Sequence, residues 1–226
     1  MANSNFLRNN KNQHSVKNSV SKKMDSEIDI AMSAVAEKLA KLYPDIIFTH
    51  KKKLSLVDII TELSLKHPKL KNSFSKVMDK SFIKPDGGFL FARKQNGKEK
   101  LILIAEVKHQ GTNDKRATEG LPKQAKGNAI ERLGKNLTAI RAIFKKEKII
   151  PFVCFGSGHD FNQDSTIVDR VITMNDFFPI NKIFIEKVHL PFEPVSMFFR
   201  YENWSKTEMV DTMLIIARQA MKNHFN

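Results

Sequence analysis

Three charged side chains, Asp86, Glu106 and Lys108, have types and spacing that would let them act at one place. Asp86 stands in a PDGG turn sequence, and Glu106 and Lys108 lie near the end of the apolar run LILIAEVK. Side chains alternate along a strand, so Glu106 and Lys108 are expected on one face and Val107 on the other. The Asn96-Gly97 hairpin signal between them allows an adjacent strand to bring Asp86 beside Glu106. We therefore predict two carboxylates and a lysine gathered at one strand end.

Two neighbouring carboxylates repel each other unless a cation joins them, and hard oxygen ligands suit Mg²⁺, with Mn²⁺ as a substitute. Such an ion can lower the pKa of a bound water and stabilise charge that builds on a phosphodiester. Lys108 would then hold the attacking water or neutralise the phosphate. Among 24 Asp and Glu residues, only Glu106 is followed two positions later by lysine. The alternative is that Glu106 and Lys108 form an ordinary solvated strand end.

A second polar group, Gly127-Asn128-Ala129-Ile130-Glu131-Arg132, opens the next expected helix. Glycine permits close approach of the backbone to another molecule, and Asn, Glu and Arg can hydrogen-bond to base edges in a DNA major groove. The same residues also fit a plain helix start, with Asn128 as N-cap and Glu131 completing a capping box. Both interpretations stay open on the residues alone.

Apolar periodicity indicates the elements that must position these groups. Leu101 to Val107 is almost continuously apolar, as expected of a strand buried on both faces. A helix from Ile130 and a second buried strand over 149–155 follow, an order that predicts a parallel pair. Further helices are expected from Asp25, from Ser55 and after a Ser205/Glu208 capping box, and further strands over 89–91, 182–188 and 195–201. We predict a single-domain α/β fold with a central mixed sheet of about five strands flanked by helices.

Composition limits the partners. The chain has 226 residues and a formal net charge of +14, which favours a polyanion such as DNA or RNA. Residues 1–24 are rich in Asn, Ser and Lys and lack acidic residues, so we expect a flexible basic arm there and one domain over 25–226. Cys154, the single cysteine, is expected to be a buried thiol. No apolar run approaches the roughly 18 residues of a membrane span, so we expect a soluble, intracellular protein.

The segments SFIKPDGG, LIAEVKHQG and GNAIERLGKN resemble those of EcoRI-like type II restriction endonucleases, in the same order and at similar spacing. These enzymes belong to the PD-(D/E)xK nuclease superfamily, whose pattern is matched here by Pro85, Asp86, Glu106 and Lys108. Weaker similarity extends from about Glu37 to the last helix. The resemblance implies a restriction-endonuclease-like fold and a homodimer in a bacterial restriction-modification system. It also implies Mg²⁺-dependent cleavage of double-stranded DNA to 5′-phosphate ends in the cytoplasm, with no membrane and no small-molecule cofactor.

The resemblance further implies a role for individual residues. Asp86, Glu106 and the Val107 carbonyl would hold the metal, and Lys108 would be the catalytic lysine. An extended segment in the major groove and the helix start after it would read a central AATT sequence. The residues expected to contact DNA are Lys84, Gly127, Asn128, Ala129, Glu131, Arg132, Lys135 and Arg170.

Departures from the family pattern fall around the reading segment. Gln124-Ala125-Lys126 replaces an apolar, small-residue stretch, Ile167 stands where an additional arginine is expected, and the segment 156–169 is shorter. These differences leave the site open between GAATTC, purine-AATT-pyrimidine and AATT alone. Two other functions remain: a repair or junction-resolving nuclease of the same superfamily, and a DNA-binding protein without catalysis.

Overall fold

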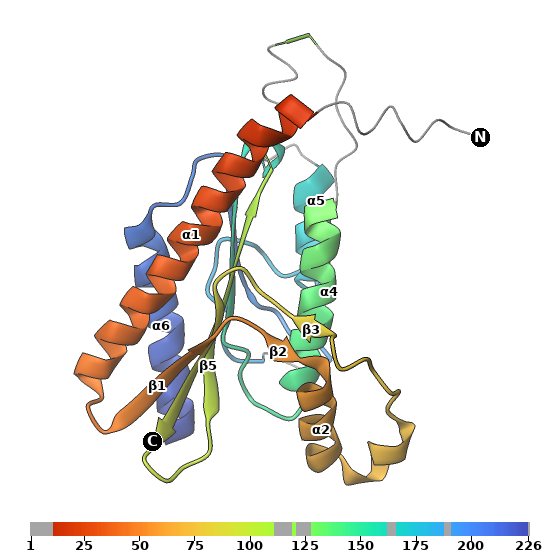
Figure 1. Cartoon of the computed structure of the whole chain (residues 1–226), viewed down its shortest axis with the longest axis vertical. Helices are drawn as coiled ribbons and strands as arrows, with labels where there is room; N and C mark the ends of the chain where they lie inside the picture. Colours follow the sequence, from red (N-terminus) through yellow and green to blue (C-terminus); the bar gives the residue numbers. More distant parts are fainter. Residues whose placement is uncertain (1–10, 111–118, 121–127, 162–165, 188–190, 226) are drawn as a thin grey trace.

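The computed structural model describes residues 11–110, 119–120, 128–161, 166–187 and 191–225. A five-stranded sheet in the order β1-β4-β5-β6-β7 lies between two helical layers (Figure 1). Its strands are β1 (Ile46–Lys51), β4 (Gly88–Lys94), β5 (Lys100–His109), β6 (Phe152–Ser157) and β7 (Ser196–Arg200), and β2 (Leu54–Ser55) pairs with β3 (Phe82–Ile83) separately. The helices are α1 (Lys11–Leu42), α2 (Leu56–Lys66), α4 (Asn128–Ile143), α5 (Thr166–Met174) and α6 (Lys206–Phe225), with short 3₁₀ helices η1 (Pro68–Ser73) and η2 (His159–Phe161).

Strand β5 is the centre of the sheet. It pairs antiparallel with β4 and parallel with β6, and β1 and β7 extend the sheet on either side. All residues from Leu101 to Val107 are buried, because strands flank β5 on both edges and helices cover both faces. Cys154 of β6 lies opposite Glu106 and is 0% exposed, which confirms the expected buried thiol. The predicted α/β fold with a mixed five-stranded sheet is confirmed.

The helices pack against the two faces of the sheet through their apolar stripes. Helices α1 and α6 pack on one face of the sheet, and α2, α4 and α5 pack on the other. Helix α4 buries Leu133, Leu137 and Ile140 at the spacing of one helical face. Each such side chain contributes about 1.5–3 kcal/mol when fully buried. In the part of the chain that the structure describes, no helix is both long and apolar enough to cross a membrane.

Two helix starts follow the predicted capping signals. Ser55 is the N-cap of α2, and its hydroxyl oxygen accepts from the Val57 backbone N–H at 3.2 Å. Before α6, the Ser205 backbone N–H donates to Glu208 Oε2 at 2.9 Å, and the Glu208 N–H donates back to Ser205 Oγ at 3.2 Å. These reciprocal bonds form the expected capping box.

Helix α1 begins earlier than expected. It starts at Lys11 rather than Asp25, so the backbone of residues 11–24 is helical where we predicted an arm. Adding turns to an existing helix costs little once tertiary packing has nucleated it, and the segment from Met24 to Leu39 supplies that packing. The predicted arm also includes residues 1–10, which lie outside the described part of the chain.

The strand predicted over 182–188 is wrong. Its described part makes isolated bridges, one from Lys182 to Met197 on β7 and one from Glu186 to Ile149 before β6. These bridges go to two different segments, so no continuous ladder forms. Tertiary context therefore overrides the strand propensity of this apolar sequence.

Candidate active site

The end of strand β5 brings the three predicted charged residues together. Lys108 Nζ lies 2.7 Å from Asp86 Oδ2 and 2.5 Å from Glu106 Oε1. The ammonium also donates to the Val107 carbonyl oxygen at 2.9 Å. The side chains of Lys108 and Glu106 are 11% and 2% exposed, which is incompatible with a solvated strand end. The end of β5 and the turn before β4 thus form a cluster of two carboxylates and one lysine, in which Glu106 is buried and Asp86, at 28% side-chain exposure, is partly buried.

A glycine turn carries Asp86 to this cluster. The Gly88 backbone N–H donates to the Pro85 carbonyl at 3.0 Å, and Gly88 adopts φ +74°, a conformation that glycine enters without steric cost. The neighbouring Gly87 N–H donates to the Ala105 carbonyl on β5 at 2.9 Å. A Cβ on Gly87 would lie 2.9 Å from the Ala105 Cβ, so the turn approaches β5 too closely for any side chain there. Both glycines are needed to hold Asp86 at the strand end.

Burial and charge shift the pKa values within the cluster. Burial raises the pKa of the Glu106 carboxyl, and the opposing effect of Lys108 offsets this only in part. Burial alone would lower the pKa of the Lys108 ammonium, but attraction from Glu106 and Asp86 raises it above its usual value. Burial, followed by repulsion from Asp86, raises the pKa of Asp25 on α1. The acids outnumber the buried ammonium, so the cluster favours a further cation.

The atoms around Lys108 Nζ also form a donor set for a metal ion. Asp86 Oδ2, Glu106 Oε1 and the Val107 carbonyl oxygen all lie within 2.9 Å of this nitrogen, so the ammonium occupies a cation position. Two carboxylates and a carbonyl are hard ligands of the kind that Mg²⁺ prefers. The described residues contain no cluster of three or more His, Cys, Asp or Glu side chains suited to a metal.

Sequence reasoning did not predict three residues around the cluster. Asn136 of α4 donates its side-chain amide to both carboxylate oxygens of Glu106 at 3.0 Å. His50 of β1 places Nε2 2.9 Å from the Gly87 carbonyl oxygen. Neither residue has a local sequence signal, because each reaches the site through long-range packing. Asp25 of α1, whose carboxyl interacts with Asp86 and Lys108, also has no local signal, because it lies at an exposed position before the apolar stripe that begins at Ile28.

Part of the predicted reading segment lies outside the described residues. Gly127 lies outside the described residues, as do the side chains of Asn128 and Ala129. The backbone of Asn128 forms the first residue of α4. Lys84, two positions before Asp86, is exposed, and Arg170 is exposed on α5.

The described part of the reading segment begins helix α4. Glu131, Arg132 and Lys135 are exposed within its first two turns. Asn136, the next residue, reaches Glu106. The exposed beginning of α4 therefore adjoins the acid cluster at the end of β5.

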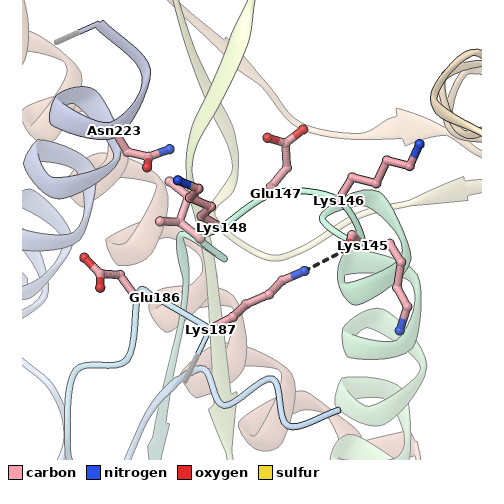
Figure 2. Close-up of a pocket in the computed structure, with 8 residues that line it drawn as sticks. Lys145, Lys146, Glu147, Lys148, Glu186, Lys187 and Asn223 are labelled. Carbon is pink, nitrogen blue, oxygen red and sulfur yellow. Dashed lines mark hydrogen bonds between the residues drawn. The ribbon is translucent and has the colours of Figure 1, made fainter. Parts of the chain in front are cut away.

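A pocket of about 470 Å³ lies near the other end of α4, which at 16 residues is about 24 Å long. Figure 2 shows Lys187 reaching across it toward Lys145. The Lys187 ammonium donates to the carbonyls of Phe144 and Lys145 and lies 3.3 Å from Glu193 Oε1. Its charge therefore caps the C-terminal end of α4. This pocket is separate from the acid cluster.

Comparisons with known proteins agree with this geometry. Residues 10–168 match the family described as restriction endonuclease EcoRI. The type II restriction enzyme RsrI of Cereibacter sphaeroides is 25% identical over 244 aligned residues, covering 92% of this chain and 87% of the relative. The type II restriction enzyme EcoRI of Escherichia coli is 30% identical over 156 residues, covering 63% of this chain and 55% of the relative. Because the family match spans well over half of the chain, including β5 and most of its neighbouring elements, the chain belongs to the EcoRI family of type II restriction endonucleases.

Proposed function

We propose that this restriction endonuclease uses Mg²⁺ to hydrolyse both strands of DNA at a palindromic site with an AATT core, leaving 5′-phosphate ends. One observation carries the metal-dependent chemistry: Asp86 Oδ2, Glu106 Oε1 and the Val107 carbonyl oxygen converge within 2.9 Å of a single cationic nitrogen. Family membership supports the DNA substrate and the reaction class.

In this proposal, Asp86, Glu106 and the Val107 carbonyl hold the metal. When bound there, Mg²⁺ supplies a water of lowered pKa and stabilises charge on the scissile phosphate. Lys108 then donates to the attacking water or to a phosphate oxygen. Its raised pKa keeps it an ammonium at neutral pH, which favours these donor roles over that of a general base.

The DNA-reading role falls to the start of α4. Arg132 and Glu131 read bases in the major groove together with the backbone of Gly127, Asn128 and Ala129. Lys84, Lys135 and Arg170 contact the DNA beside them. A homodimer completes the proposal, because a two-fold axis presents the same reading residues to each half of a palindrome.

The outer base pairs of the site are proposed to be relaxed. Ile167 stands where the family resemblance places an additional arginine, and its side chain is 0% exposed within the core. Hydrogen-bonding readout of a base edge needs a polar side chain that reaches the groove, which a buried isoleucine cannot supply. This observation favours purine-AATT-pyrimidine or AATT over GAATTC.

Digestion of a sequenced genome, followed by sequencing of the fragment ends, tests the proposal directly. We expect discrete double-strand cuts that require Mg²⁺ or Mn²⁺, end in 5′-phosphates and share an AATT core. Cuts at another palindrome would overturn the proposed site but leave the reaction intact. If AATT-rich plasmid DNA stayed intact with either metal across several salt concentrations, the proposed reaction would be wrong.

Two comparisons separate the alternatives. A junction-resolving nuclease would cut branched DNA faster than a linear palindrome. For a DNA-binding protein without catalysis, Glu106→Ala would change nothing in a cleavage assay, because the parent would already be inactive. We expect Glu106→Ala to abolish cleavage and retain metal-free specific binding, whereas Thr138→Ala, at an exposed position of α4, should behave as the parent.

A further inference from the structure

Asn136 makes an unusual contact for a residue outside the acid–lysine motif. Its Nδ2 lies 3.0 Å from both Oε1 and Oε2 of Glu106, which is 1% exposed. An ionised carboxylate only accepts hydrogen bonds, so the amide nitrogen must face it. The amide fixes the carboxylate in orientation but, unlike Lys108, brings no charge that would compete with a metal ion.

The helix that carries Asn136 also carries the exposed residues proposed to read DNA. Arg132 precedes Asn136 by one helical turn, about 6 Å along the axis. Buried Leu133 and Leu137 fix this part of α4 against the core. The beginning of α4 and the Glu106 carboxylate are thus joined by a short, packed connection.

We infer that Asn136 is a positioning residue that makes the orientation of Glu106 depend on the placement of helix α4. The inference rests on the proposed function, because it gives this contact a role in coupling DNA reading to metal binding. When the exposed start of α4 is seated on the correct site, the amide holds both oxygens of Glu106 in the orientation that binds metal. On a wrong base sequence the start of α4 is held less firmly, so the amide orients the carboxylate less well and metal binding weakens.

The first experiment measures Mn²⁺ binding to the full chain by electron paramagnetic resonance of the free ion, so no cleavage is needed. Asn136→Leu approximately keeps the side-chain volume but removes the amide donor. Asn136→Ala removes both the volume and the donor, whereas Asn136→Gln keeps an amide. We expect the Leu and Ala variants to bind Mn²⁺ about 10- to 100-fold more weakly, as for other partners of metal ligands. Asn136→Gln should lie closer to the parent, and Thr138→Ala should equal it.

Metal-free DNA binding shows whether each variant keeps its fold, and thermal unfolding measures the stability that the lost hydrogen bonds supplied. We expect Asn136→Leu to unfold at a somewhat lower temperature than the parent, because buried Glu106 loses a hydrogen-bond donor, but to bind DNA without metal as the parent does. If Asn136→Leu keeps the Mn²⁺ affinity of the parent, Asn136 does not position Glu106 for metal. This result would stand whether or not the parent cuts DNA, so it is distinct from a failure of the proposed function.

The second experiment tests the coupling to DNA reading. Single-turnover cleavage is compared on the recognition duplex and on a duplex with one base pair changed. For Asn136→Ala we expect a loss of about 10- to 100-fold on the recognition duplex and a clearly smaller loss on the changed one. If the cleavage rate fell by the same factor on both duplexes, the proposed coupling would be wrong, because the effect of Asn136 would not depend on the DNA sequence.

Discussion

Lys108 Nζ lies 2.7 Å from Asp86 Oδ2, although the two residues are 22 positions apart and belong to a strand end and a turn. Replacing Lys108 by Met removes the cation from the buried Glu106 carboxylate and the partly buried Asp86 carboxylate. We expect metal-free stability to fall by about 3 kcal/mol, the usual cost of breaking a buried pair from one side. Cleavage should fall by a factor of at least about 100, as for loss of a transition-state donor.

Urea unfolding and single-turnover cleavage measure these two effects of Lys108→Met. Lys146→Met, on the pocket at the other end of α4, is the matched control and should cleave as the parent does. If Lys108→Met cleaved DNA as fast as the parent, Lys108 would have no role in cleavage.

Gly88→Ala should disrupt the turn that carries Asp86. Gly88 has φ +74°, and an added Cβ would lie 2.6 Å from the Lys51 carbonyl oxygen and 2.8 Å from His50 Nε2. Strain of this kind costs about 1–3 kcal/mol before any clash with backbone is counted. We expect lower stability in urea unfolding and loss of cleavage. Gly97→Ala, whose Cβ would meet its nearest neighbours at 3.5 Å, should be tolerated, and equal effects of the two changes would contradict this account.

Arg132→Ala and Lys135→Ala should weaken DNA binding in different ways. Loss of a base contact by Arg132 should weaken binding to the recognition duplex by about 1–3 kcal/mol. The difference in affinity between the recognition duplex and unrelated DNA should therefore become smaller. Loss of a phosphate contact by Lys135 should weaken both duplexes similarly and reduce the salt slope by about one. Metal-free binding at several salt concentrations measures both. If Lys135→Ala lost sequence preference and Arg132→Ala did not, Lys135 would be the residue that reads bases and Arg132 the one that contacts phosphate.

Glu208 makes the capping box before α6 dependent on pH. Hydrogen bonds from Arg200, and then from Ser205, lower the pKa of the Glu208 carboxyl to about 2. Because the folded-state pKa is depressed, this stabilisation is complete above the usual value of 4.5 and is lost as the pH falls toward 2. Its side chain is 43% exposed, so solvent screening limits the effect to about 1 kcal/mol.

Denaturant unfolding of the parent and of Glu208→Gln checks this dependence. The stability difference should be largest near neutral pH and should shrink between about pH 4.5 and pH 2 as the parent carboxylate takes up its proton. A difference that stays constant through this range would contradict the ionised capping box.

Glu106 and Lys108 could be placed on one face of a strand from sequence because alternation along a strand is a local property. Asp86 was also predictable, since the turn around it and the Asn96-Gly97 turn enclose one short hairpin. The capping of α2 and α6 likewise followed from residues a few positions apart. These features share one cause, which is that neighbours in the chain determine them.

Asn136 and His50 were missed because their contacts depend on how α4 and β1 pack against β5. Helical periodicity shows which face of α4 is apolar, but not which turn stops beside Glu106. The segment 182–188 was misassigned for the same reason, since its backbone partners belong to two separated segments. Helix α1 starts earlier than its apolar pattern predicts, because the packed segment from Met24 onward lets further turns be added toward Lys11.

The Lys108 ammonium provides Asp86 and Glu106 with a counter-ion from the same polypeptide. The two carboxylates are therefore already held together without a metal ion. In the proposed reaction, a divalent ion would join a site that is already formed, rather than drive its folding as in small metal-dependent domains.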